Sequence, residues 1–174
     1  MMSKTQRYWK WGRVLLAASF VIFCACLPAA AAGSANKQLT MPKPAVKDKC
    51  PVCGMFVAKY PDWVMAVRFR DGSHVYFDGA KDMFKYLFDL KRYAPSRKAA
   101  DIQTILVRDY YHLSAIDARK ALYIIGSDIY GPMGRELIPL AHEDDAREFS
   151  TDHQGKKILK FSEITAEVVK SLDQ

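Results

Sequence analysis

The 174-residue sequence lacks the motifs on which the common enzyme classes depend. It has no nucleophile elbow with a matching serine, histidine and aspartate, and no glycine-rich loop of the kind that binds phosphate. It has a single Cys-x-x-Cys motif, and none of its histidines, at positions 74, 112, 142 and 153, has the spacing of a zinc finger. These absences predict a binding protein and not an enzyme.

Acidic residues are absent from the basic stretch 1–13, which precedes an apolar run over residues 14–32. This order, with small residues at its end, predicts an export signal or membrane anchor over residues 1–32. Cleavage is expected after Ala32, but the run is also long enough to span a bilayer uncleaved, and Cys26 could carry a lipid. All three alternatives place the rest of the chain in the periplasm, because the positive end stays inside.

Outside this segment, the chain has a small net charge and few cysteines. Four of the 26 basic residues lie in it, so 22 basic against 19 acidic residues leave a formal charge of +3, which gives no reason to expect a nucleic-acid partner. Two of the four cysteines, Cys24 and Cys26, also lie in it. The exported part keeps only Cys50 and Cys53, in an oxidising compartment where an idle thiol pair tends to form a disulfide.

The composition of the remaining chain predicts a tether followed by one domain. Residues 33–48 are rich in small residues, proline and lysine, which is typical of a flexible tether. Residues 49–174 predict an α+β fold of two small related halves, at about 49–95 and 101–174, each with antiparallel strands packed against a helix. Strands are expected at 63–69, 74–78, 102–107, 122–125, 137–140 and 157–161, and helices at 80–90, 143–152 and 162–172, with Asp78 and Ser162 as caps.

The segment from Cys50 to Gly54 has the form of a metal-binding knuckle, in which both thiolates face one ion. If the chain continues as a strand, the thioether of Met55 points to the same face as the thiol of Cys53. Met133 lies in a loop between proline and glycine, where the backbone can approach a partner closely. A thiolate with thioethers favours Cu(I), although each methionine has a simpler interpretation as a side chain that fills the core.

Two other interpretations of the cysteine pair stay open on the residues alone. A structural zinc site would need two of the histidines as further ligands. A thiol–disulfide redox pair usually lies at the start of a helix, which lowers a thiol pKa. Here Pro51, Gly54 and the apolar residues after them indicate a strand and not a helix.

Several motifs in combination resemble the NosL family, the accessory proteins associated with nitrous oxide reductase. They are CGMFV, the hairpin ending in FDG, YYHLSAIDARKALYIIGSD, and YGPMGRELIPL followed by a helix and KILKF. The resemblance covers about residues 50–161 and implies a fold of two related halves, each a small sheet with a helix.

The resemblance also implies a function. It implies a periplasmic protein, often lipid-anchored, that binds Cu(I) and supplies it for assembly of a copper enzyme such as nitrous oxide reductase. Its partner would be that enzyme or the enzyme's membrane maturation complex. The family's ligands fall on Cys53, Met55 and Met133, whereas Cys50 is an extra thiol that would add a ligand or shield Cys53.

Overall fold

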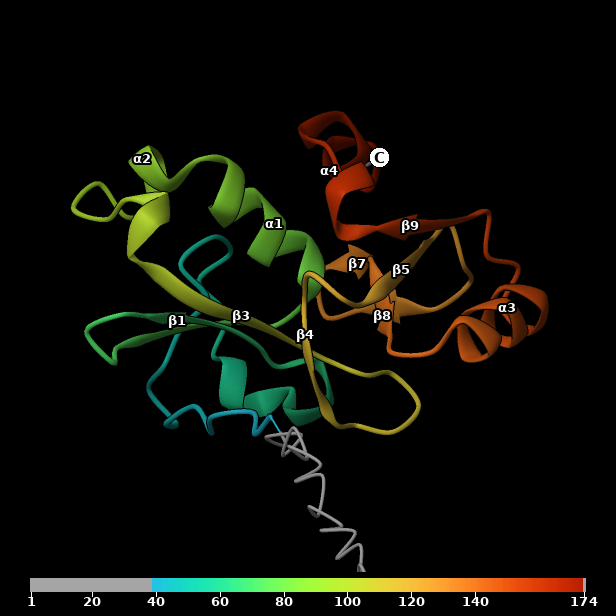
Figure 1. Ribbon diagram of the computed structural model, residues 1–174, viewed down its shortest axis with the longest axis horizontal. Helices are drawn as coiled ribbons and strands as arrows, with labels where there is room; N and C mark the ends of the chain where they lie inside the picture. Colours follow the sequence, from blue (N-terminus) through green and yellow to red (C-terminus); the bar gives the residue numbers. More distant parts are fainter. Residues whose placement is uncertain (1–38, 174) are drawn as a thin grey trace, which may run out of the picture. The chain divides into compact units, whose positions relative to one another are not determined.

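The computed structural model describes residues 39–173, so the predicted export segment, 1–32, lies outside the described residues. The described chain is an α+β fold with two main antiparallel sheets (Figure 1). Its strands are β1 (Met65–Phe69), β2 (His74–Phe77), β3 (Ile102–Arg108), β4 (Ala115–Asp117), β5 (Leu122–Ile125), β6 (Tyr130–Gly131), β7 (Gly134–Arg135), β8 (Ile138–Leu140) and β9 (Lys157–Lys160). Its α-helices are α1 (Ala80–Phe88), α2 (Leu90–Tyr93), α3 (Glu143–Asp152) and α4 (Ala166–Ser171), and 3-10 turns form η1 (Val57–Lys59), η2 (Pro61–Trp63), η3 (Ala99–Asp101) and η4 (Phe161–Glu163).

The two main sheets repeat one topology. The first has the strand order β2-β1-β3-β4 and the second has the order β8-β5-β9. In each, a central strand pairs antiparallel with a strand before the helix and with a strand after it, and the β6–β7 hairpin lies between β5 and its partner β8. The units β1-β2-α1-β3 and β5-β8-α3-β9 therefore correspond element by element, which confirms the prediction of two related halves.

The predicted boundary between the halves is wrong. Residues 102–107 were expected to open the second half, but they form β3, which pairs with β1 in the first sheet. Val67 of β1 lies opposite Ile105 of β3. Pairing between distant segments leaves no local signal in the sequence, so the long linker before β3 was taken for the boundary.

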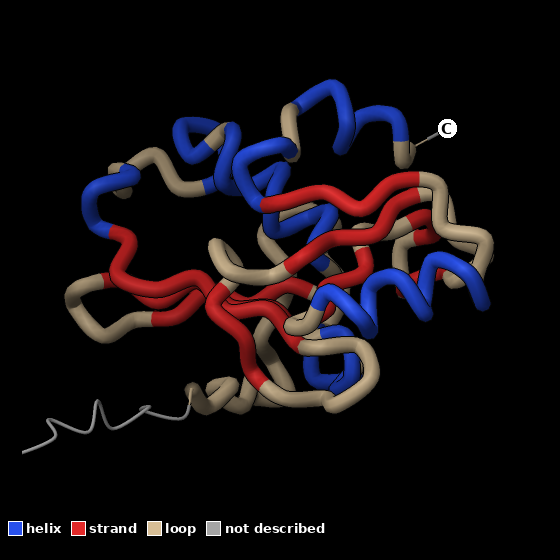
Figure 2. Tube along the Cα trace, turned by 45° about the vertical axis from the view of Figure 1, so that its right-hand side comes forward, coloured by secondary structure: helices blue, strands red, loops and turns tan. Residues whose placement is uncertain are grey.

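The helices pack on the sheets, and the larger of two buried clusters joins the two halves. Helix α1 packs against β1, β2 and α4, and α3 packs against the second sheet (Figure 1). Figure 2 shows helical segments above and below the strands. Phe84 of α1 lies edge-on to Tyr123 of β5, with ring centres 5.3 Å apart, and both side chains are buried in the same cluster. The halves are therefore not independent domains.

Several predicted ends and caps differ from the structure. The first predicted strand starts at Met65 because the residues before it form η2, and the last helix starts at Ala166, where the Thr165 side chain and not Ser162 accepts a hydrogen bond from an amide of the first turn. Gly79 and not Asp78 is the N-cap of α1. Strand β4 and the hairpin β6–β7 were not predicted.

The chain before the first sheet lies on the domain as far as it is described. Pro44 is buried and Met41 packs against the core, within the segment that the sequence assigns to a tether. Among the helices of residues 39–173, none combines the length and the apolar character that crossing a membrane requires.

Candidate metal centre

The Cys-x-x-Cys segment folds into a tight knuckle. The Cys50 amide donates to the Met55 carbonyl at 2.9 Å, and the Gly54 amide donates to the Cys50 carbonyl at 2.9 Å. Gly54 has a φ of +80°, a conformation that favours glycine because a Cβ atom would be strained there. The expectation of a strand after the knuckle is wrong, because the chain turns at Gly54 and enters η1 at Val57.

The thiols of the knuckle face two aspartates at the start of α1. The Cys50 thiol donates to Asp82 Oδ2 at 3.4 Å, and the Cys53 thiol donates to Asp78 Oδ1 at 3.2 Å. One ligand atom from each of these four residues lies within 4.8 Å of the others. We call the four residues the Cys–Asp cluster. It has the size and the donor atoms of a metal centre.

Burial and charge keep both thiols protonated in the absence of a cation. Cys50 is only 1% exposed, and its burial raises the pKa of its thiol, with a further increase from the nearby charge of Asp82. Burial also raises the pKa of Cys53 to about 12, and the carboxylates of Asp82 and Asp78 add to the increase. A cation bound here would replace the thiol protons and neutralise the buried carboxylates.

Met55 and Met133, the two methionines predicted as ligands, lie in different surroundings in the structure. Met55 is half-buried, and its carbonyl closes the knuckle. Because Gly54 breaks the extended backbone, strand alternation does not bring the thioether of Met55 beside the Cys53 thiol. Met133 lies at the tip of the β6–β7 hairpin and is 41% exposed, so it does not fill the core.

Adjacent residues of α1 contact the knuckle and the Met133 hairpin. Asp82 accepts from Cys50, and the neighbouring Lys81 Nζ donates to the Met133 carbonyl at 2.9 Å. The buried carboxylate of Glu136, just after the hairpin, accepts from the Lys81 amide at the first turn of α1. The start of α1 therefore holds both segments that were predicted to carry ligands.

Comparison with known proteins identifies the family to which this chain belongs. A sequence profile of the family described as NosL matches residues 42–169. The chain belongs to the NosL family. A curated relative, the "Copper-binding lipoprotein NosL" of Stutzerimonas stutzeri, is 29% identical over 123 residues, which cover 67% of this chain and 62% of the relative. The chain thus matches less than two thirds of that relative's length.

A solved structure has the same fold. The copper chaperone NosL from Shewanella denitrificans superposes with a TM-score of 0.59 and 24% sequence identity, over 73% of this chain and 99% of that one. At this identity the likeness supports the fold of this NosL-family chain and no more.

Sequence reasoning missed the two aspartates of this NosL-family centre. Asp78 was interpreted as a helix cap, and Asp82 was not singled out. They lie 25 and 32 positions from their thiol partners, so no local spacing links them. The only available signal was two acidic residues four apart at the start of a helix, which places both near one face.

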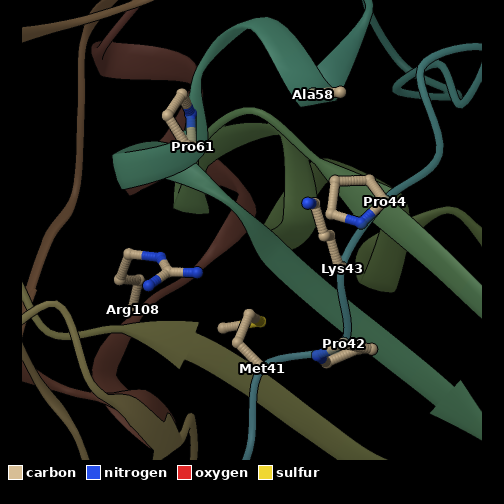
Figure 3. Close-up of a pocket in the computed structure, with 7 residues that line it drawn as sticks. All are labelled: Met41, Pro42, Lys43, Pro44, Ala58, Pro61 and Arg108. Carbon is tan, nitrogen blue, oxygen red and sulfur yellow. The ribbon is translucent and has the colours of Figure 1, made fainter.

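A separate pocket of about 130 Å³ contains none of the predicted ligands. Met41, Pro42, Lys43 and Pro44 of the N-terminal segment line it, together with Ala58, Pro61 and Arg108 (Figure 3). The Arg108 guanidinium points towards the Met41 side chain in this view. No residue of the Cys–Asp cluster lines this pocket, so it is not part of the candidate metal centre.

Proposed function

We propose that this NosL-family protein is a Cu(I)-binding chaperone, which holds the ion at the knuckle and delivers it for assembly of a copper enzyme such as nitrous oxide reductase. The observation that carries the proposal is the pair of free thiols, from Cys50 and Cys53, whose sulfurs lie within reach of one ion. Thiolate sulfur is a ligand that selects Cu(I). The names of the relatives point to the same metal.

In this proposal each predicted ligand has a role. The thiolate of Cys53 anchors the ion and cancels its charge. The Cys50 thiolate is a second sulfur ligand on the buried side of the site. Met55 and Met133 supply neutral thioethers that hold Cu(I) and release it readily. The attachment of the Met133 hairpin to Lys81, next to Asp82, supports one site built from both segments.

The proposed location follows from the predicted export segment. The chain would act in the periplasm, anchored if the signal stays uncleaved or if Cys26 is lipidated, as the word lipoprotein in the name of the S. stutzeri relative suggests. Its partner would be the copper-accepting enzyme or that enzyme's membrane maturation complex. Neither binding to nucleic acid nor catalysis is part of the proposal.

Zinc is the second candidate, because the two aspartates favour it. Two thiolates and two carboxylates complete a tetrahedral zinc site without any histidine. The redox alternative loses support, because a reactive thiol needs a lowered pKa, whereas burial raises the pKa of Cys53 to about 12.

The test is a competitive Cu(I) titration of anaerobically purified protein against a chromophoric Cu(I) chelator. One ion should bind, Cys53→Ser should abolish binding, and Met55→Leu and Met133→Leu should each weaken it at least tenfold. Met83→Leu is the matched control, since Met83 is a buried core methionine of α1. An unchanged affinity in Met133→Leu would rule out the site built from two segments. Zinc in the purified protein, with no Cu(I) uptake, would favour the second candidate.

A further inference from the structure

The repeated topology allows the two halves to be compared position by position. In the first half, the ligand pair Cys50 and Cys53 precedes the central strand β1, and Asp82 is the third residue of α1. The pair Asp109 and His112 has the same spacing and also precedes a central strand, β5, although it lies in the loop between β3 and β4 of the first sheet. Asp145 is likewise the third residue of the corresponding helix, α3.

Asp109, His112 and Asp145 meet in space, as the residues of the Cys–Asp cluster do. His112 Nδ1 lies 3.0 Å from Asp109 Oδ1 and 3.7 Å from Asp145 Oδ2. One ligand atom from each of the three residues lies within 4.8 Å of the others. In a tetrahedral zinc site with bonds of about 2.0 Å, neighbouring ligand atoms lie roughly 3.3 Å apart. The two distances from His112 Nδ1 lie within about 0.4 Å of that spacing.

The surroundings hold these groups in place and leave one acceptor unused. Asp109 is fully buried, and its two oxygens accept from the amides of Tyr111, His112 and Ala141, which fixes the carboxylate. Asp145 Oδ2 is a buried oxygen with no hydrogen-bond partner. Buried polar atoms rarely lack a partner, and a bound cation is one remedy.

We propose that Asp109, His112 and Asp145 form a second metal site, for a borderline divalent ion such as Zn²⁺. Two carboxylates and one imidazole select such ions over Cu(I), which prefers sulfur. The ion would replace the Nδ1 proton of His112 and give Asp145 Oδ2 its partner. Solvent can deliver it, since the His112 side chain is 57% exposed. The His142 ring, with its centre 6.1 Å from that of His112, is near enough to add a donor after a side-chain rotation.

The simpler alternative is that His112 Nδ1–H only donates a hydrogen bond to Asp109, with no metal present. The two cases differ at one atom, His112 Nδ1, which carries either a proton or a metal. A zinc titration of the full chain, followed by long-range ¹H–¹⁵N NMR of the imidazole rings, reads that atom directly. Zinc bound at the thiols does not obscure this signal.

We expect Zn²⁺ added beyond the one equivalent that the thiols can take to remove the proton signature of His112 Nδ1 and to shift its ¹⁵N resonance. His112→Gln and Asp145→Asn should each bind one zinc ion fewer than the wild type, by competition with a chromophoric chelator. His153→Gln is the matched control, because His153 Nδ1 lies 3.2 Å from the single carboxylate of Asp128. Far-UV circular dichroism checks that each variant is folded.

Three results would overturn the second site. They are an unchanged His112 resonance at excess zinc, equal zinc stoichiometry in the wild type and His112→Gln, and equal losses in His112→Gln and His153→Gln. Cu(I) binding at the knuckle should be the same in His112→Gln as in the wild type, so the second site and the proposed chaperone function can fail independently.

Discussion

Cys50 and Cys53 are three positions apart, yet they differ in accessibility. Cys50 belongs to the core, whereas Cys53 is half-buried at the surface. Both thiols have raised pKa values because of burial, so both carry a proton in the metal-free protein at neutral pH. A metal ion that binds to these thiolates would therefore release protons, and its affinity would depend on pH.

This release predicts the slope of Cu(I) affinity against pH. Each thiol that becomes a ligand gives up one proton, so the dissociation constant should fall about tenfold per pH unit for each of them. Between pH 6 and 8 we expect a slope of two for the wild type and of one for Cys50→Ser. The measurement is a chelator competition corrected for the chelator's own pH dependence. A wild-type slope of one would remove Cys50 from the ligand set.

The sequence identified the thiols but not their carboxylate partners. A Cys-x-x-Cys motif is a local signal, and the hydrogen bonds that close the knuckle lie within it. Asp78 and Asp82 come to the thiols only through the packing of α1, which depends on the whole core. The role of Met55 was predicted from strand alternation, which Gly54 interrupts with its positive φ.

At the scale of elements, the contact between the start of α1 and the segment after β7 depends on the buried carboxyl group of Glu136. Glu136 accepts from the amides of Lys81 and Leu137, and it fills the space beside Gly79, where a Cβ atom would collide with its carboxylate. Burial raises the pKa of Glu136 to about 8. The folded protein therefore holds a proton here that the unfolded chain loses at an ordinary glutamate pKa.

This difference predicts how stability changes with pH. Below about pH 4.5 both states are protonated at Glu136 and the group has no effect. As the pH rises towards 8, the unfolded chain ionises first, so the free energy of unfolding should fall by about 1.4 kcal/mol per pH unit. Glu136→Gln should lack this component. Urea unfolding of both proteins from pH 5 to 8 measures it, and parallel curves would contradict the prediction.

Elements with a strong local pattern were predicted well. Helix α3 and strand β5 have the expected bounds, and α1 begins where its apolar spacing predicted. The strands that were missed, β4, β6 and β7, have two or three residues each, which is too short for a periodic pattern to be recognised. They form because neighbouring strands offer hydrogen-bonding partners, as β3 does for β4.

At the scale of the whole molecule, the larger of two buried clusters is shared by the two halves. Phe84 of α1 is buried and packs against Tyr123 of β5 and Phe161 of η4, with ring centres 5.3 and 5.1 Å away. A side chain of the first half is thus enclosed by rings of the second. The halves repeat a topology, but neither encloses this ring alone.

The shared core predicts one cooperative unfolding transition. Phe84→Ala should lower the free energy of unfolding by about 3–5 kcal/mol without splitting the transition. Urea curves followed by tryptophan fluorescence and by far-UV circular dichroism should coincide in the wild type and the variant. Phe88→Ala is the control, since Phe88 is 47% exposed on the same helix, and it should cost far less. Two separate transitions would show that the halves unfold independently.

The unequal exposure of the two thiols has a kinetic consequence for any ion held at the knuckle. An incoming ligand can reach the ion only from the open side, where Cys53 lies, because Cys50 is enclosed by the core. We therefore expect exchange to proceed by attack of the acceptor on the bound ion, with the Cys50 sulfur displaced last. Release without an acceptor should then be slow, and the rate of transfer should rise with acceptor concentration. The side from which a bound ion would leave the site is thus set by the sulfur that faces solvent, which is that of Cys53.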